Sequence, residues 1–308
     1  MGINKLNRYQ SFSEYLKYLT DLHYQQIEEK DVNSSATIFF SAIEKDTHKK
    51  ILIKRFTKEL DKYHEFEIES YTLENLDHDN IIKPIAIFED SEYGYIVFPY
   101  AEGGDLFDLI YSRNIQFDNE QLKIIAYSLI SALDKIHSKG YIYRDIKFEN
   151  IVLRRNINDM QKEFDTDDIV LIDFGSCYVD SISENLYDFR GTSFYQAPEY
   201  IYHRKVTEKY DIFSLGILLY YLVTSYLPFD INYDYDEFEF SMIFSENNIS
   251  DLFTGNEWSG FSSGIKELIQ SMLLFDDRAR ASTQELLKND LFSNLLSPYD
   301  LAHEYEDY

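Results

Sequence analysis

The stretch Tyr143-Arg-Asp-Ile-Lys-Phe-Glu-Asn150 places five charged or amide side chains within eight residues. It follows a helical pattern that Gly140 ends, and the apolar Ile151-Val-Leu153 comes directly after it. A second segment, Ile169-Val-Leu-Ile-Asp-Phe-Gly175, is a predicted strand that ends in an acid, an aromatic residue and a glycine. Polar groups on loops that regular elements hold in place are typical of functional sites. We therefore expect chemistry at these two loops.

Three further features follow in order along the chain. They are Gly191-Thr-Ser-Phe-Tyr-Gln-Ala-Pro-Glu199, Asp211-Ile-Phe-Ser-Leu-Gly216 and Arg280. Any one of these segments alone would be weak evidence. In this order, and each in its expected strand, loop or helix setting, the motifs resemble the signature set of protein kinases. The resemblance extends from Tyr24 to Phe292 and is to eukaryotic-type protein kinases of the serine/threonine class.

The first part of the chain has the pattern of a sheet. Three stretches rich in β-branched and aromatic residues are predicted strands, namely Thr37–Ile43, Ile51–Phe56 and Tyr93–Phe98. A polar turn is predicted over Asp46–Lys50, and one helix is predicted from about Lys58 to Leu76.

From Ala101 onward the pattern is helical. Asp118-Asn-Glu-Gln121 predicts a capping box, and the helix that follows is predicted to end where Gly140 adopts a left-handed conformation. The stretch Ile212–Val223 is apolar on nearly every face, which predicts a buried central helix. A small β-rich part before a larger helical part predicts the α+β class. The resemblance implies a two-lobed fold with a small antiparallel sheet lobe and a mainly helical lobe.

We divide the chain into four parts on this basis. They are a leader over residues 1–23, an N-lobe over 24–100, a C-lobe over 101–296 and an acidic tail over 297–308. A cleft between two lobes is a natural ligand site.

The charge of the chain limits its partners. It contains 55 acidic and 29 basic residues among 308, for a formal net charge of −26. Nucleic acids and anionic membranes are bound through clustered lysine and arginine, so we expect neither as a partner. A basic protein or a basic substrate segment would be attracted. The alternative is that the charge only maintains solubility, and the composition supports both interpretations about equally.

The single cysteine, Cys177, cannot form an intramolecular disulfide, which fits a cytoplasmic protein, with the nucleus as the alternative. Between Met1 and Thr20 no sustained apolar stretch predicts a secretory signal. The longest apolar run, Ile212–Val223, is too short to span a bilayer. We expect a monomer that does not associate with membranes.

The resemblance assigns catalytic roles to polar residues of both halves. A transferring phosphoryl group carries charge, so catalysis is mainly positioning and charge neutralisation. By resemblance, Asp145 accepts or orients the proton of the substrate hydroxyl, and Lys147 reaches the γ-phosphate of ATP. Asn150 and Asp173 supply oxygen ligands to Mg²⁺. Lys54 holds the α and β phosphates.

Glu69 is the expected partner of Lys54, with Glu65 and Glu67 as alternatives. Residues 65 and 69 share a helix face by their spacing of four. Taken alone, a lysine on a strand is usually a surface residue, and a glutamate on an acidic helix usually faces water. These structural interpretations do not explain why all the motifs occur in a fixed order.

A second group of residues is expected around the adenosine. Asp105 is expected at the ribose, and the adenine is expected to contact Phe39, Leu52, Phe98, Ala101 and Val152. Leu52 stands where the family has alanine, and Phe39 stands where valine is usual. Overfilling a packed pocket costs roughly 1–3 kcal/mol, which would weaken binding about tenfold to a hundredfold.

The glycine-rich phosphate loop of the family is absent, because the corresponding segment, Asp31-Val-Asn-Ser-Ser-Ala-Thr37, contains no glycine. Glycine allows backbone N–H groups to approach phosphates closely. Two functions therefore stay open. One is an active serine/threonine protein kinase, and the other is a pseudokinase that serves as a scaffold and binds nucleotide weakly or not at all. Phosphorylation of a small molecule or lipid is less favoured, because by resemblance Gly191–Glu199 docks peptides.

The resemblance also bears on substrate and regulation. Lys147 is typical of the serine/threonine class, and Glu149 and Asp105 favour substrates with basic residues upstream of the target. Arg144 is usually paired with a phosphorylated activation segment, and Asp188 could replace that phosphate with a fixed carboxylate.

Structural roles are expected for a further set of residues. By resemblance, Glu199 forms a buried ion pair with Arg280, and Asp211 holds the backbone of the catalytic loop. An apolar column linking the lobes is expected from Leu73, Tyr143 and Phe174.

Overall fold

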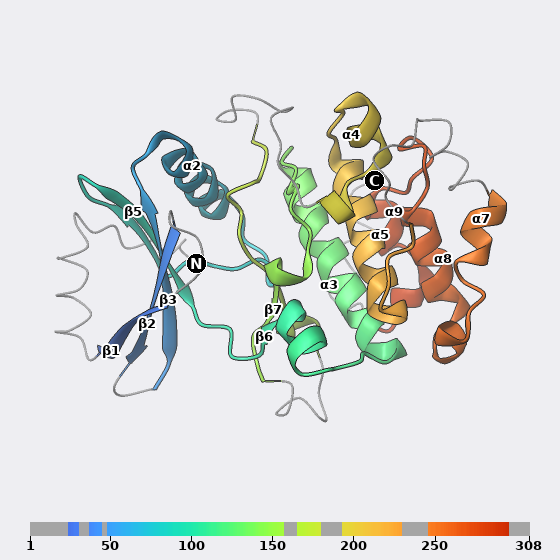
Figure 1. The fold of residues 1–308 in the computed structure, drawn as a ribbon, viewed down its shortest axis with the longest axis horizontal. Helices are drawn as coiled ribbons and strands as arrows, with labels where there is room; N and C mark the ends of the chain where they lie inside the picture. The colour runs from blue at the N-terminus through green and yellow to red at the C-terminus, as the bar shows by residue number, and fades with distance from the viewer. Residues whose placement is uncertain are drawn as a thin grey trace, which may run out of the picture.

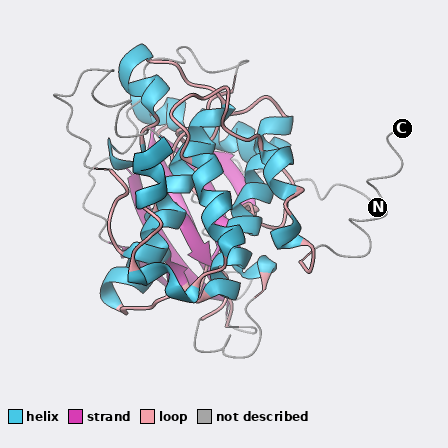
Figure 2. Ribbon diagram, turned by 90° about the vertical axis from the view of Figure 1, so that its right-hand side faces the viewer, coloured by secondary structure: helices cyan, strands magenta, loops and turns pink. Residues whose placement is uncertain are grey.

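The computed structural model describes residues 24–30, 37–44, 48–156, 165–179, 193–229 and 246–295. A sheet with one helix forms one side of the molecule, and a larger helical part forms the other (Figure 1). The view in Figure 2 looks onto the helical part, with the strands behind it. The predicted α+β class with two lobes is confirmed.

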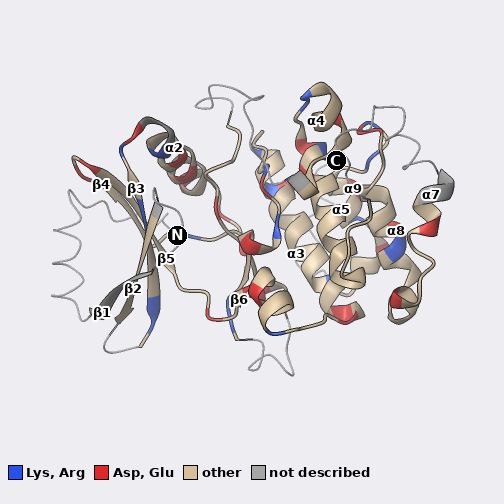
Figure 3. Ribbon diagram, in the orientation of Figure 1, with Lys and Arg blue, Asp and Glu red and all other residues tan. Residues whose placement is uncertain are grey.

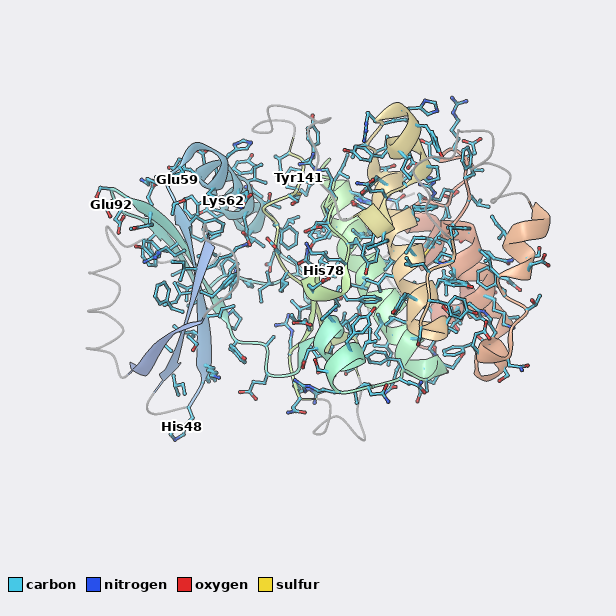
Figure 4. The ribbon with its side chains drawn as sticks, viewed as in Figure 1. His48, Glu59, Lys62, His78, Glu92 and Tyr141 are labelled. Carbon is cyan, nitrogen blue, oxygen red and sulfur yellow. The ribbon has the colours of Figure 1, made fainter. Side chains whose placement is uncertain are left out.

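The sheet of the small lobe is antiparallel and has the order β1-β2-β3-β5-β4. Its strands are β1 (Tyr24–Lys30), β2 (Thr37–Glu44), β3 (Lys50–Thr57), β4 (Ala86–Glu89) and β5 (Tyr93–Pro99). The three predicted strands match β2, β3 and β5 to within one residue at each end. Figure 4 shows His48 in the turn between β2 and β3, away from the helical part.

Strand β3 has one face that packs in an apolar cluster and an opposite face that borders a cavity. Successive side chains of a strand point to opposite faces. Ile51 and Ile53 are buried in a small apolar cluster within the sheet. Leu52 and Lys54 therefore lie on the opposite face, where both line a cavity. The alternation of apolar residues in this strand thus fixes the side on which Lys54 can act.

One helix of the small lobe, α2 (Leu60–Asn75), packs against β3 and β5. It begins two residues later and ends one residue earlier than predicted. The helical part contains α3 (Asn119–Ser138), α4 (Pro198–His203), α5 (Glu208–Thr224), α7 (Glu246–Asp251), α8 (Ser263–Met272) and α9 (Thr283–Leu287). A three-stranded sheet near the junction consists of β6 (Gly104–Asp105), β7 (Ile151–Leu153) and β8 (Ile169–Leu171).

The signals at the ends of α3 act as predicted. The Asp118 side chain accepts from the backbone N–H of Gln121, and the Gln121 side chain accepts from the Asp118 N–H, which completes a capping box. After the helix, Gly140 has φ 74°, the left-handed conformation that glycine adopts without steric cost. The central helix α5 is buried over most of its length, as its apolar composition predicts.

Several predictions fall on parts of the chain outside the described residues. They concern the leader, the tail, the phosphate loop over 31–36, Asp188 and the peptide-docking residues 191 and 192. The lobe boundaries stay predictions. Within the described ranges, none of the helices combines the length and the apolar character that a membrane crossing requires.

Candidate active site

Lys54 joins the two lobes through a pair of short ion pairs. Its Nζ lies 2.7 Å from Oε2 of Glu69 on α2 and 2.9 Å from Oδ1 of Asp173, which follows β8. Glu69 is completely buried. The structure therefore places Glu69 against Lys54, whereas Glu65 pairs with Lys62 and Glu67 faces solvent. The spacing of residues 65 and 69 did not distinguish between them, and the orientation of α2 does.

At Lys54, Glu69 and Asp173, burial and the neighbouring opposite charges shift the pKa in opposite directions. Desolvation acts to lower the pKa of Lys54, but the charges of Asp173 and Glu69 outweigh it and raise that pKa, so the ammonium stays charged. Desolvation acts to raise the pKa of Asp173, but the charge and hydrogen bond of Lys54 and the charge of Lys147 lower it below its usual range. Burial raises the pKa of Glu69. The site thus holds one ammonium between two acids, of which Asp173 is ionised at neutral pH.

The loop between α3 and β7 brings the other predicted catalytic residues together. The Asp145 carboxylate accepts from Lys147 Nζ at 2.6 Å and from Asn150 Nδ2 at 2.8 Å. Asn150 Nδ2 also donates to the backbone oxygen of Asp145. Because the amide nitrogen points toward Asp145, the amide oxygen points away from it, and this is the atom that a cation would require.

Asp211, near the start of α5, fixes the backbone of this loop through hydrogen bonds to its carboxylate. Its carboxylate accepts from the backbone N–H of Tyr143 at 2.9 Å, from that of Arg144 at 2.7 Å and from His137 Nε2 at 2.8 Å. Its side chain is fully buried. Arg144 and Asp173 both have positive φ, 70° and 60°, a conformation that non-glycine residues adopt only where surrounding contacts stabilise it. The expected structural role of Asp211 is confirmed.

Tyr143 and Phe174 form the expected aromatic contact, with ring centroids 5.2 Å apart in an edge-to-face arrangement. The Tyr143 hydroxyl also donates to the backbone oxygen of Ile172, the residue before Asp173. Leu73 of α2 is buried in the same apolar core. These contacts fix the backbone that presents Asp173 to Lys54.

A cavity of about 670 Å³ lies where these groups converge. It is lined by eleven of the twelve residues predicted for catalysis and cofactor binding: Phe39, Leu52, Lys54, Glu69, Phe98, Ala101, Asp105, Lys147, Asn150, Val152 and Asp173. The twelfth, Asp145, accepts hydrogen bonds from Lys147 and Asn150, which both line the cavity. Figure 3 shows acidic positions on α2 and near β6. Among the acidic residues that line the cavity, Glu69 lies on α2 and Asp105 on β6.

The cavity also contains residues that the sequence analysis missed. They are Ile82, Pro99, Tyr100, Gly104 and Ile172. Pro99 and Tyr100 lie between two predicted residues, so their position in the chain could have identified them. Ile82 had no such signal. It reaches the cavity because its backbone N–H donates to Leu171 of β8, far along the chain.

The residues present fit a Mg²⁺ ion that enters with a nucleotide. Asn150 and Asp173 offer one amide oxygen and one carboxylate, both hard ligands of the kind that Mg²⁺ binds. In the described part of the chain, no group of three or more His, Cys, Asp or Glu side chains is arranged to hold a metal. Two protein ligands match an ion whose other ligands are phosphate oxygens and water.

Two further expectations concern residues next to the site. Glu199 and Arg280 form the expected buried pair, with Nη1 to Oε1 at 2.8 Å and Nη2 to Oε2 at 3.1 Å. Cys177 is buried, and burial raises the pKa of its thiol to about 12. A thiol in that state is a poor nucleophile, which supports the interpretation of Cys177 as an ordinary packing residue.

Comparison with protein families gives an independent result. The family model described as "Protein kinase domain" matches residues 34–292 of this chain. The match begins within the predicted phosphate loop and ends at the last short helix of the described residues.

Comparison with individual proteins agrees with the family result. The chain is 32% identical over 239 residues to calcium-dependent protein kinase 4 of Plasmodium berghei (strain Anka), covering 77% of this chain and 42% of that protein. It is 32% identical over 250 residues to calcium-dependent protein kinase 4 of Plasmodium falciparum (isolate 3D7), covering 81% and 44%. It is 29% identical over 212 residues to a calcium and calcium/calmodulin-dependent serine/threonine-protein kinase of Pisum sativum, covering 69% and 38%. The aligned part is thus less than half of each of these relatives.

Proposed function

The chain belongs to the protein kinase family, with relatives in its eukaryotic serine/threonine class, and from this premise we propose that it is an active enzyme. It transfers the γ-phosphoryl group of ATP, with Mg²⁺, to serine or threonine hydroxyls of protein substrates. Those substrates carry basic residues near the target.

The observation that supports activity is that the polar groups of the site lie in contact with one another. Lys54 contacts both Glu69 and Asp173. The Asp145 carboxylate is held at the same time by Lys147 and Asn150. Catalysis of phosphoryl transfer is mainly positioning and electrostatics, so a site preorganised in this way needs little rearrangement.

Each polar group then has one task. Lys54 neutralises the α and β phosphates and is itself oriented by Glu69. Asn150 and Asp173 hold the Mg²⁺ ion, which neutralises charge on the phosphates when it is bound. Lys147 lies 2.6 Å from Asp145, close enough to place a γ-phosphate beside the carboxylate that orients the substrate hydroxyl.

Charge supports a basic substrate. Glu149 and Asp105 line the cavity on the side of the large lobe. Among the described residues, neither carboxylate forms an ion pair with a lysine, arginine or histidine. The formal net charge of −26 adds a long-range attraction for basic segments.

A pseudokinase scaffold is the second candidate, because Leu52 and Phe39 both line the cavity and reduce the space for adenine. The volume of about 670 Å³ argues against complete closure. Small-molecule sites usually span about 300–1,000 Å³. We therefore expect weakened nucleotide binding rather than none.

The test measures binding and transfer separately. Mg·ATP at millimolar concentration should raise the melting temperature, because a ligand that binds the native state stabilises it by mass action. The protein should also phosphorylate a serine peptide with upstream arginines. Asp145→Asn should lower kcat by about 10²–10⁴-fold while the thermal shift is retained.

Asp77→Asn is the matched control, because it changes an exposed aspartate outside the cavity and should leave kcat unchanged. A thermal shift without any transfer by the unaltered protein would favour the scaffold. No shift and no transfer would contradict nucleotide binding itself.

We further propose that the protein acts as a monomer in the cytoplasm, with the nucleus as the alternative. The single cysteine in 308 residues supports a reducing compartment. Fluorescence microscopy of a tagged protein and light scattering of the purified chain would test these two points.

A further inference from the structure

The small-lobe sheet has a second apolar cluster on the face that points away from the active site. We call it the outer-face cluster, and its members are Phe40, Ala42, Ile51, Ile53, Ala86, Phe88, Tyr95 and Val97. Ile53 of β3 lies opposite Phe40 of β2 and Val97 of β5. Val97 in turn lies opposite Ala86 of β4, so four strands contribute to the cluster. Ala42, Ile53 and Val97 are fully buried.

Complete burial of this face requires another layer over it, because an apolar sheet face is stable only when a further element packs against it. Of the described helices, α2 is the one with extensive contacts to this sheet. Its Glu69 contacts Lys54, and the ring of its Phe66 lies 5.6 Å from that of Phe56. Lys54 and Phe56 alternate with Ile53 along β3, so α2 lies on the opposite face. The layer over the outer-face cluster therefore comes from outside the described residues.

Position in the chain favours the leader, residues 1–23, as this layer. The leader runs directly into β1, which starts at Tyr24 and forms the edge of the sheet beside β2. A segment that joins the edge strand can turn over either face, and α2 with the cavity already borders one of them. The other small-lobe segments outside the described residues are 31–36 and 45–47. Both connect neighbouring strands and are too short to form a further layer.

The sequence of the leader has the pattern of a helix with one apolar face. Ser11-Phe-Ser-Glu14 has the spacing of a capping box. Apolar residues then recur at helical spacing, at Phe12, Tyr15, Leu16, Leu19 and Leu22. Glu14, Lys17 and Asp21 fall on the other side of such a helix. A helix over 12–22 would extend about 17 Å, enough to cross roughly four strands that are spaced about 4.8 Å apart.

We propose that residues 12–22 form an amphipathic helix that packs its apolar side on the outer-face cluster. The sheet of the small lobe then lies between two helices. Strand β3 directs Lys54 toward the active site and Ile51 and Ile53 toward the leader, so the leader stabilises the strand that positions Lys54. The protein kinase family model begins at residue 34, so the leader lies outside the part of the chain that the family shares.

The experiment measures the accessibility of the outer face in the full chain. Ala42→Cys introduces a thiol at a fully buried position of the cluster, and the native Cys177 is also buried. With the leader unaltered, a maleimide should therefore react slowly with both thiols, and peptide mapping by mass spectrometry distinguishes them. Leu16→Ser, added to Ala42→Cys, should increase the labelling rate at position 42 about tenfold, because the leader loses a buried apolar contact and opens more often.

Thermal denaturation gives a second measurement. Leu16→Ser and Leu19→Ser should each lower the melting temperature by about 5 °C, because each removes an apolar side chain from the contact. Lys17→Ser is the matched control. It introduces the same residue in the same segment but on the polar side, so it should leave the melting temperature and the labelling rate nearly unchanged. Leu19→Ala is a smaller change that keeps the test possible if the serine variants do not fold.

Three outcomes would overturn the inference. Rapid labelling at position 42 with an unaltered leader would show that the outer face is open. Equal effects of Leu16→Ser and Lys17→Ser would show that the apolar side of the leader does not cover it. Protection that is lost on dilution, together with dimers in light scattering, would identify a second copy of the chain as the cover. None of these measurements uses phosphate transfer, so their result is independent of the proposed function.

Discussion

Leu52 and Phe98 lie opposite each other on the neighbouring strands β3 and β5 and line the same wall of the cavity. Leu52 is only partly buried, and its side chain lies at the edge of the main hydrophobic core, where it lines the cavity. The free energy of nucleotide binding should therefore depend on this one side chain more than the stability of the fold does.

Leu52→Ala should tighten Mg·ATP binding by about tenfold, because it removes bulk from a pocket where overfilling costs roughly 1–3 kcal/mol. Isothermal titration calorimetry measures the change in Kd. Ile38→Ala is the control, because Ile38 is also partly buried in the same sheet but packs against the small cluster away from the cavity. If Leu52→Ala left the affinity unchanged or weakened it, Leu52 would not obstruct the nucleotide.

At the scale of elements, α3 shows how local chemistry positions a distant site. The helix begins at a capping box and ends before Gly140, and the catalytic loop starts three residues beyond that glycine. Buried side chains such as Leu129, Leu133 and Ile136 fix its rotation in the core. Where α3 ends therefore sets where the catalytic loop begins.

Asp118→Ala should lower the free energy of unfolding by about 1 kcal/mol, because the backbone N–H of Gln121 loses its acceptor at 2.9 Å. Urea denaturation measures the loss. Asp118→Asn supplies the comparison, since an asparagine at the same position still offers an acceptor oxygen and should be nearly as stable as the original. Equal stability of the alanine variant would show that the cap contributes nothing here.

At the scale of the whole molecule, one buried cation connects segments that are far apart in the sequence. Arg280 donates to Glu199 of α4, to the backbone oxygen of Lys209 on α5 and to that of Leu274. Its side chain is fully buried. Removing either partner would leave an uncompensated charge in the interior, so the pair contributes to the integrity of the large lobe.

Arg280→Ala should destabilise the protein by about 3–5 kcal/mol, a large part of the 5–15 kcal/mol typical of domains. Arg280→Lys keeps the charge with fewer donors, so its stability should lie between that of the unaltered protein and that of Arg280→Ala. The prediction can therefore be tested even if the alanine variant does not fold. Lys83→Ala removes an exposed ion pair with Asp77 and should change stability by about 1 kcal/mol or less. Thermal denaturation in which all variants melted together would contradict the structural role of Arg280.

Local pattern was enough to predict the strands β2, β3 and β5, the capping box of α3 and the buried α5. These follow from the periodicity of apolar residues and from end signals, which act over a few neighbours along the chain. The residues of the site were predicted from the resemblance of the motifs to those of protein kinases. The choice among Glu65, Glu67 and Glu69 did not follow from them. Neither did the place of Ile82 in the cavity or the contact between Tyr111 and Tyr221.

Those features depend on contacts between distant segments. Glu69 is 15 residues from Lys54, and Asp173 is 119 residues from it. Tyr111 and Tyr221 are 110 residues apart. Such pairs form only when helices and strands pack in one particular rotation and register. Packing is set by the fit of whole surfaces, which no short stretch of residues encodes.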